Sequence, residues 1–284
     1  SSSATATNPR TPTATGSKPI WDYSYFHPNT ELEDLNDIDV WEGQGRIVAA
    51  NIFEAHANDS CLCTLREFRS LRATMLEVAE AKLARPDEDG HKILRVFIHE
   101  ADVEQRDMLQ TAGYIHTEER DRTMSRCDIP DSEVDVADGF ELRSLGEVND
   151  LGKVNRVMWR GFNHPGEPPE DIIPFRKRMQ SSPNFRFDLT LVALAPNGDY
   201  ASYCGMWYDA VNRFGYVEPV ATDPDYRRMG LGKAVVTESM KRCGRVGAKV
   251  IYVGSGQPFY RSMGFEPLYE HHCWTKSMES ATFV

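Results

Sequence analysis

Residues 216–256 read YVEPVATDPDYRRMGLGKAVVTESMKRCGRVGAKVIYVGSG, and this stretch decides the fold of the chain. Its apolar, β-branched start predicts a strand, and a glycine-containing loop follows. An amphipathic stretch of about 16 residues then predicts a helix, and the apolar run 249–253 predicts a buried strand. A strand, a loop, a helix and a second strand form an α/β unit.

The loop before this helix predicts a phosphate site. Gly230 and Gly232 stand where the loop becomes the helix, and without side chains they let backbone N–H groups close on an anion. The helix dipole favours negative charge there, and Arg227, Arg228 and Lys233 add cations. The loop lacks the Gly-Lys-Ser/Thr of a Walker A loop and the third glycine of the Rossmann fingerprint. A diphosphate ligand fits these residues.

The two halves of the chain resemble each other. Residues 92–126 contain an apolar strand, a helical stretch, a Gly-aromatic turn and a further strand, and residues 249–276 repeat that order. Upstream, residues 41–55 and 194–208 each contain a strand, a glycine turn and a second strand. This internal duplication predicts two similar α/β domains.

The predicted domains span 19–130 and 139–284, and an Asp- and Pro-containing segment joins them. Residues 1–18 are rich in Ser, Thr, Ala and Pro, which predicts a disordered tail; an organelle transit peptide is the alternative. The predicted helices span 64–83, 147–162 and 170–180, and the predicted strands span 187–195, 199–208 and 214–221. An aromatic core strand, or alternatively a binding surface, is predicted to contain Tyr23, Tyr25, Phe26 and His27.

Composition narrows the functional classes. The formal charge of −11 argues against a nucleic-acid partner, because a phosphate backbone requires clustered Lys and Arg. No apolar run approaches the roughly 18 residues of a membrane span, and the N-terminus lacks the apolar segment of a secretory signal. We therefore expect a cytoplasmic protein without a membrane partner.

The cysteines and histidines do not predict a metal site or a disulfide framework. The six cysteines form no CxxC pair, so we expect reduced thiols. His271, His272 and Cys273 are consecutive, and neighbouring strand residues point to opposite faces, so these three side chains cannot converge on one ion.

Three motifs give the chain a family resemblance. Residues 227–232, RRMGLG, match the Gln/Arg-x-x-Gly-x-Gly/Ala signature of the GNAT acetyltransferase superfamily. The preceding DPDY at 223–226 and the YRSMGF at 260–265 are typical of the same superfamily and stand in the expected order. The resemblance covers residues 139–276, and the first half of the chain matches it only in outline.

The resemblance implies a fold and a co-substrate. Each half is expected to be an α/β (α+β) domain, with a mixed, largely antiparallel central sheet flanked by helices. Acetyl-CoA is the implied acyl donor, and no metal is required. Backbone groups of Val220, Ala221 and Thr222 would hold its pantetheine arm. The residues implied to surround its pyrophosphate are Arg227, Arg228, Met229, Gly230, Leu231, Gly232, Lys233 and Ala234.

Two side chains are candidates for acid–base chemistry. The two-residue strand period places Glu218 on one face with Tyr216 and Val220, and we nominate Glu218 as the general base, acting directly or through water. A structural hydrogen bond is the alternative role; several relatives carry the catalytic Glu two positions earlier. Tyr260 occupies the position that in the superfamily donates a proton to the departing thiolate, and a core aromatic is its alternative role.

The first half is expected to be a degenerate copy. Residues 46–89 contain no glycine, so no comparable loop can form there, and Leu109 stands where the second half has Tyr260. We expect this half to shape the substrate pocket, support a homodimer or stabilise the second half.

The expected acceptor is a small-molecule amine: a simple amine, an amino acid, an antibiotic amine or a thiol-linked sugar. A protein N-terminus or lysine is the alternative. The segment from Trp159 to Glu170 is expected to cover the acceptor groove. Trp159, Phe162 and His164 are candidate contacts, with a packed core as the alternative. Glu167, Glu170 and Asp171 either attract a cationic acceptor or form a solvated helix start. The leading hypothesis is an N-acetyltransferase with one active site in the second half. The alternatives are a non-catalytic acyl-CoA-binding regulatory module and a site for another phosphate-bearing ligand.

Overall fold

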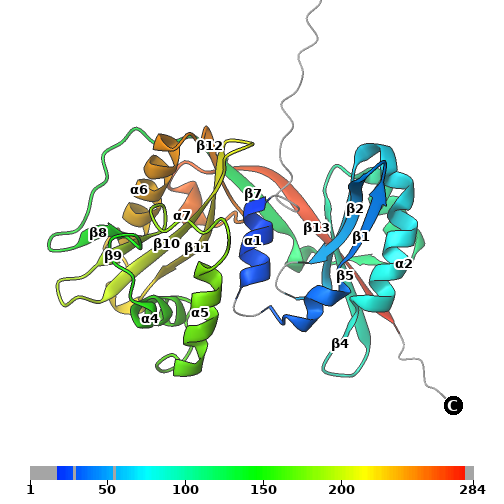
Figure 1. Ribbon diagram of the computed structural model, residues 1–284, viewed down its shortest axis with the longest axis horizontal. Coiled ribbons are helices and arrows are strands. Elements are labelled where there is room, and N and C mark those ends of the chain that lie inside the picture. Colours follow the sequence, from blue (N-terminus) through cyan, green and yellow to red (C-terminus); the bar gives the residue numbers. More distant parts are fainter. Residues whose placement is uncertain (1–17, 28–29, 54–55, 279–284) are drawn as a thin grey trace, which may run out of the picture.

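The computed structural model describes residues 18–27, 30–53 and 56–278. The predicted tail lies outside the described residues except for Lys18. Within the described part, no helix is long and apolar enough to cross a membrane. The molecule is a mixed α/β structure with helices flanking mostly antiparallel strands, as the sequence predicts (Figure 1). The strands of both halves form one large sheet, whereas a separate sheet was expected in each half.

The elements alternate along the chain in both halves. The first half contains α1 (Lys18–Phe26), β1 (Asp39–Gly43), β2 (Arg46–Phe53), β3 (Asp59–Thr64), α2 (Arg72–Lys82), β4 (Arg85–Pro86), β5 (Lys92–His99), α3 (Val103–Thr111), β6 (Ile115–His116) and β7 (Arg122–Cys127). The second half contains β8 (Glu141–Ser144), α4 (Leu151–Gly161), α5 (Ile173–Gln180), β9 (Leu191–Leu194), β10 (Tyr200–Asp209), β11 (Phe214–Thr222), α6 (Leu231–Arg245), β12 (Val250–Val253), α7 (Pro258–Arg261) and β13 (Glu266–Met278). Short 3-10 turns are η1 (Glu33–Asp37), η2 (Arg66–Leu71), η3 (Glu118–Arg120), η4 (Glu170–Ile172) and η5 (Pro224–Tyr226).

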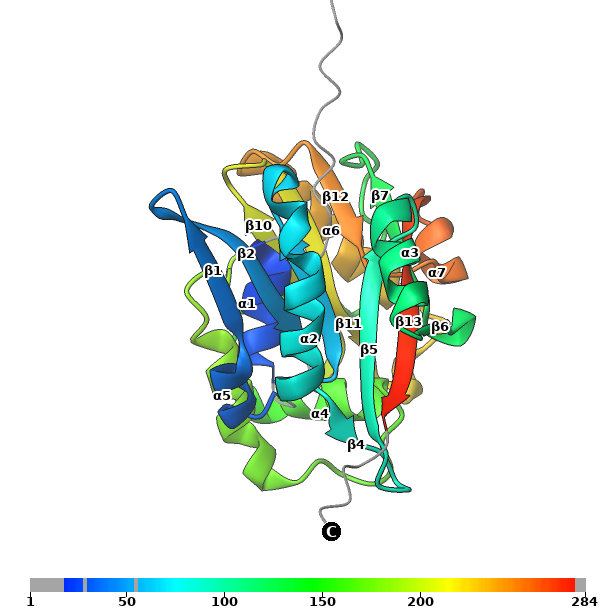
Figure 2. The same ribbon diagram turned by 90° about the vertical axis from the view of Figure 1, so that its right-hand side faces the viewer.

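The two halves share one sheet by exchanging their last strands. The strand order is β1-β2-β3-β5-β13-β7-β12-β11-β10-β9-β8. The last strand of the second half, β13, therefore pairs with β5, and β7 of the first half pairs with β12. Figure 2 shows β13 (red) beside β5. The sequence ranges 19–130 and 139–284 consequently do not coincide with the two halves of the sheet.

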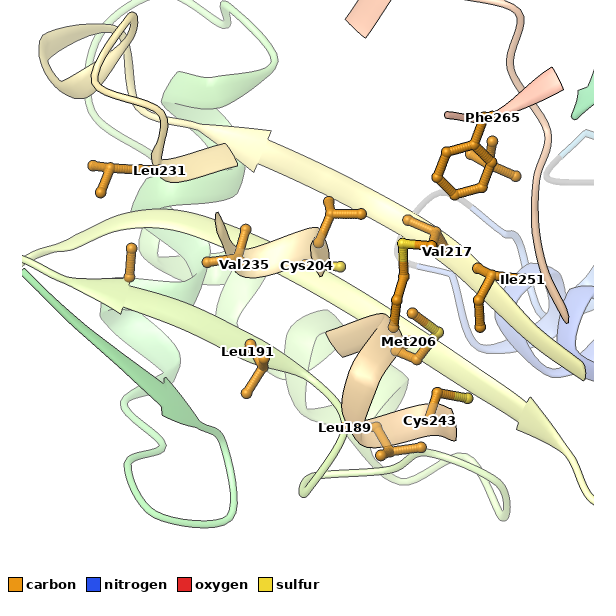
Figure 3. Close-up of a cluster of buried hydrophobic side chains, with 14 of the residues drawn as sticks. Leu189, Leu191, Cys204, Met206, Val217, Leu231, Val235, Cys243, Ile251 and Phe265 are labelled. Carbon is orange, nitrogen blue, oxygen red and sulfur yellow. The ribbon is translucent and has the colours of Figure 1, made fainter. Parts of the chain in front are cut away.

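Helix α6 forms the main core of the second half. Its buried side chains recur every three or four residues, at Val236, Met240 and Cys243 among others, which turns one stripe toward β10 and β11. These side chains meet Met206, Val217 and Ile251 of the sheet (Figure 3). Each such fully buried aliphatic side chain contributes about 1.5–3 kcal/mol. This packing fixes the start of α6, and hence the loop before it, against the end of β11.

The other sheet face carries α4 and α5, and a separate core around α2 serves the first half. Helix α4 begins at Leu151 and not at 147, because the Asp150 side chain accepts the backbone N–H of Lys153 at 3.1 Å and caps the helix there. The predicted helix 64–83 is a 3-10 turn followed by α2, with a kink at Phe68, where φ is −113°.

The N-terminal aromatic residues form helix α1 and not the predicted strand. Aromatic pairs four residues apart contact each other: the ring centroids of Trp21 and Tyr25 are 4.1 Å apart, and Tyr23 meets His27, the residue after α1, edge to face at 5.1 Å. Helix α1 lies between the two halves (Figure 1). Ile20 of this helix packs with Trp207 and Tyr216 of the second half. The side chain of Arg178 on α5 donates to the backbone carbonyl of Thr30 at 2.9 Å, which ties the segment after α1 in place. An N-terminal helix therefore reaches the middle of the molecule.

Candidate active site

The loop between β11 and α6 has the geometry of an anion cradle. Gly230, the residue before α6, has a left-handed backbone with φ of +78°, which favours glycine. The first backbone N–H groups of α6 have no acceptor within the helix. A Cβ at Gly232 would lie 3.0 Å from the Thr222 Oγ1, so a side chain there would crowd the cradle. The predicted fit to a phosphate is consistent with this geometry.

Ion pairs hold this loop against α4. Asp223, fully buried, accepts two hydrogen bonds from Arg160, at 2.7 and 3.1 Å. Burial raises the pKa of Asp223, but the hydrogen bonds that it accepts from Arg160 and from the Asp225 N–H lower it by more. The pKa of Asp223 is therefore below its usual value. Arg227 donates to the Gly161 carbonyl at 2.9 Å. This guanidinium, predicted to contact phosphate, thus also locks the loop to α4.

Two other cations remain available for a ligand. The side chains of Arg228 and Lys233 are exposed and make no ion pair with any described residue. They stand on either side of Gly230, at the positive end of the α6 dipole.

A cleft of about 740 Å³ runs from this loop to the middle of the sheet. It opens because β12 pairs only with Phe214–Tyr216 of β11, so the two strands diverge beyond that point. Its lining includes nearly all predicted cofactor residues, namely Val220, Ala221, Thr222, Arg227, Arg228, Gly230, Leu231, Gly232 and Lys233. Met229 and Ala234 are not among the residues that line this cleft. Ala234 lies on the buried face of α6, which packs against the sheet.

A β-bulge sets the direction of Glu218. Gly205 of β10 faces two residues of β11, Glu218 and Pro219, where a regular ladder would place one. The extra residue interrupts the two-residue period. Val220 therefore packs toward α6, whereas Tyr216 faces α1. Tyr216 and Glu218 line the same cavity, which confirms the prediction that they share a face. Val220 packs against the core under α6, so the prediction that it shares this face is wrong.

Glu218 has a partner from the other end of the chain. The buried Tyr23 hydroxyl hydrogen-bonds with the Glu218 carboxylate. Burial, reinforced by the charge of Glu218, raises the pKa of Tyr23 well above its usual value, so the hydroxyl stays protonated and donates to the carboxylate. Sequence analysis missed this contact; the only signal was the aromatic run that contains Tyr23.

Tyr260 faces the same cleft from α7. Burial, followed by the charge of Glu218, raises its pKa far above its usual value, so this phenol carries its proton at neutral pH. The structure thus brings Glu218 and Tyr260 to one cleft. A carboxylate that accepts a proton and a phenol that holds one can perform acid–base chemistry there.

Two further cavities meet the cleft at Glu218. One, of about 310 Å³, lies between the halves, and its lining includes Tyr23, His27, Tyr216, Gly254 and His271. The other, of about 560 Å³, lies among α1, α4 and α5, and its lining includes Tyr23, Trp159, Phe162, His164 and Arg176. The candidate acceptor contacts therefore do line a cavity. Glu167, Glu170 and Asp171 are exposed and line neither one, so the structure supports a solvated helix start.

The first half contains a cleft in the corresponding place. β3 pairs with β5 only at Asp59 and Ser60, and a cavity of about 820 Å³ opens beyond them. Leu109, the counterpart of Tyr260, is fully buried. The Arg72–Asp102 ion pair, at 2.6 Å, lines this cavity. The first half therefore repeats the strand divergence without the glycine loop or the phenol.

The consecutive residues 271–273 do not converge, as strand alternation predicts. His271 lies beside His99, while His272 turns toward His116 and Asp121 on the opposite side of β13. His116, Asp121 and His272 bring ligand-type atoms within 4.8 Å of one another. Asp121 is already engaged: it accepts from the Cys273 N–H at 2.9 Å and hydrogen-bonds His116 at 3.0 Å.

Comparison with known proteins identifies a domain in the second half of the chain. Residues 154–265 match the model of the Acetyltransferase (GNAT) family, and this match includes the loop, α6 and both acid–base candidates. The chain carries a GNAT-family domain. A search of curated proteins found no match to the sequence.

Solved GNAT structures share the fold over most of the chain. A GCN5-related N-acetyltransferase from Sphaerobacter thermophilus superposes with a TM-score of 0.63 at 16% identity, covering 84% of this chain and 80% of that one. A tandem GNAT protein from the clavulanic acid biosynthesis pathway gives 0.61 at 15% identity, covering 86% and 84%. A GCN5-related N-acetyltransferase from Kribbella flavida gives 0.55 at 13% identity, covering 90% and 95%. These matches extend through both halves, and at such identities they establish the GNAT fold alone.

Proposed function

We propose that this GNAT-family domain transfers an acetyl group from acetyl-CoA to the nitrogen of a small-molecule amine. The observation that carries the proposal is the single cleft that joins the glycine loop of α6 to Glu218 and Tyr260. The family is one of acetyltransferases, which supports acyl transfer in general. One active site per chain follows, because the first half lacks the loop.

Several parts of the cleft would hold the donor. The amides at the start of α6, with Arg228 and Lys233, would bind its pyrophosphate, and the unpaired edge of β11 from Val220 to Thr222 would bind its pantetheine arm. Acetyl-CoA supplies the activated thioester. The remaining task of the protein is to align an amine and to move two protons.

The two acid–base candidates would move these protons. Glu218 would accept a proton from the amine, directly or through water, as the new N–C bond forms. Tyr260 would give its proton to the sulfur as the S–C bond breaks. Tyr23 would hold the Glu218 carboxylate in position through its hydrogen bond. No covalent enzyme intermediate is required, because the amine itself is the nucleophile.

A thermal melt with acetyl-CoA, followed by a thiol-release assay over a panel of amines, tests the proposal. A ligand at 100 times its Kd stabilises the native state by about 2.7 kcal/mol, which raises the melting temperature by several degrees. A shift together with amine-dependent thiol release would support acetyl transfer. A shift without release for any amine would favour the regulatory module, and no shift would overturn both.

The double variant Arg228→Gln with Lys233→Gln is expected to weaken acetyl-CoA binding by about tenfold at low salt, because two cations at the pyrophosphate are lost. The salt dependence of Kd, measured by calorimetry, should also become shallower. Arg245→Gln removes an exposed cation from the other end of α6 and serves as the control. Equal affinity and equal salt dependence in the double variant and the control would contradict this placement of the pyrophosphate.

Tyr260→Phe is expected to lower kcat by about 10- to 100-fold, since the proton for the leaving thiolate would have to come from water. The affinity for acetyl-CoA should change little. Because the raised pKa keeps the Tyr260 phenol protonated, the unmodified protein has this proton donor at pH 7 as well as in acid. The fall in kcat should therefore be seen at both pH values. A loss of cofactor affinity that fully accounts for a lower rate would instead indicate that Tyr260 packs against the ligand.

A further inference from the structure

The 560 Å³ cavity beside Glu218 combines an apolar wall with one cation. Met158, Trp159, Phe162, Phe175 and Met179 form much of its lining. Among its described lining residues, Glu218 is the only carboxylate and Arg176 the only guanidinium or ammonium group. Its volume falls within the range of small-molecule sites, and it meets the acetyl-transfer cleft at Glu218 and Phe162.

Arg176 is held in place but carries an unmatched charge. Its Nε donates to the Asn155 side-chain oxygen at 3.1 Å, and Asn155, itself 1% exposed, is fixed within α4. No carboxylate of the described residues forms an ion pair with Arg176, and the nearby groups that act on its charge are the hydroxyls of Tyr23 and Tyr203. Burial lowers the pKa of Arg176, which reflects the cost of keeping this cation away from water.

The neighbouring groups do not neutralise this cation. Burial raises the pKa of Tyr203, and burial together with Glu218 raises that of Tyr23, so both phenols are neutral at pH 7. His27, which also lines the cavity, has a pKa lowered to about 4 by burial and is likewise uncharged. A partly buried cation without an ion-pair partner among the described residues is costly, and a ligand anion would offset that cost by accepting from the two terminal nitrogens of the guanidinium.

Building on the proposed function, we propose that the acceptor is an amino acid with an apolar or aromatic side chain. Its amine would face Glu218, its carboxylate would bind the terminal nitrogens of Arg176, and its side chain would lie among the aromatic residues of α4 and α5. The acceptor thus carries one positive and one negative group, matched to the one carboxylate and the one guanidinium of the cavity.

Binding of matched ligand pairs tests this proposal without requiring turnover. Phenylalanine and phenethylamine share an amine and an aromatic ring, and only phenylalanine has the carboxylate. Calorimetry on the unmodified protein with CoA present should show that phenylalanine binds at least tenfold more tightly than phenethylamine. Leucine and isopentylamine provide the aliphatic pair. In Arg176→Gln the preference should fall by about 10- to 100-fold, because a charge-assisted pair is lost. Arg176→Lys should keep part of it.

Lys177→Gln is the matched control, because Lys177 is the next residue on α5, is exposed and does not line the cavity. It should leave the preference unchanged. Equal or weaker binding of phenylalanine relative to phenethylamine in the unmodified protein would overturn the proposal, and so would an equal loss for both ligands in Arg176→Gln when the variant melts normally. A failure of the proposed function would give a different result. Acetyl-CoA would then neither raise the melting temperature nor release thiol, whether or not the protein prefers phenylalanine to phenethylamine.

Discussion

Glu218→Gln is expected to reduce kcat by about 10²- to 10⁴-fold while acetyl-CoA binds nearly as before, because the amide cannot accept the amine proton. The substitution keeps the size of the side chain and an oxygen that can accept the Tyr23 hydroxyl. The bulge is also kept, because it depends on the backbone of Glu218, whose carbonyl accepts the Trp207 indole N–H at 2.8 Å. Steady-state kinetics over a range of pH, with cofactor affinity measured separately, provides the check.

Two comparison variants separate the role of this carboxylate from general damage. Glu266→Gln removes an exposed carboxylate at the start of β13 and should leave the rate unchanged. Tyr23→Phe removes the hydrogen bond to Glu218 but keeps the base, so its effect should be below tenfold. A fully active Glu218→Gln protein would mean that another group, or solvent alone, takes the proton.

The parts of the site that lie close together in sequence were predictable. The loop residues from Arg227 to Lys233 carry their own local signals, since a left-handed Gly230 and a helix start require particular residues whatever the rest of the chain does. The position of Tyr260 followed from the same motif order. Local backbone chemistry therefore predicted the loop that lines the proposed cofactor side of the cleft.

The proposed acceptor side depends on contacts between distant segments, and the sequence carries little signal for these contacts. Tyr23 reaches Glu218 only because α1 packs between the halves, and Arg176 reaches the same cavity only because α5 crosses beside α4. The exchange of β7 and β13 is equally invisible, since either partner strand offers the same ladder of backbone groups. The Val220 side chain points to the opposite face because β11 contains one extra residue at the bulge. The alternation of apolar and polar residues in the sequence does not predict this bulge.

Gly205→Ala is expected to cost about 3 kcal/mol of stability and most of the activity, because the position opposite the bulge has no room for a side chain. A Cβ there would lie 2.3 Å from the backbone oxygen of Glu218 and 2.9 Å from its carbonyl carbon. Backbone atoms cannot rotate away as the end of a long side chain can. β10 and β11 must therefore separate at the point where Glu218 is aimed into the cleft.

The control is Gly146→Ala, where the nearest atom to an added Cβ is 3.5 Å away, an ordinary contact, so the melting temperature should change little. Chemical denaturation measures the stability of both variants, and the rate of the folded fraction gives the activity. A Gly205→Ala protein that loses stability but keeps its rate per folded molecule would show that the bulge supports the sheet and does not aim the base. A proportionate fall in kcat at unchanged acetyl-CoA affinity would tie the direction of Glu218 to the absence of a side chain at Gly205, because the proposed cofactor loop begins beyond the end of β11, after Thr222.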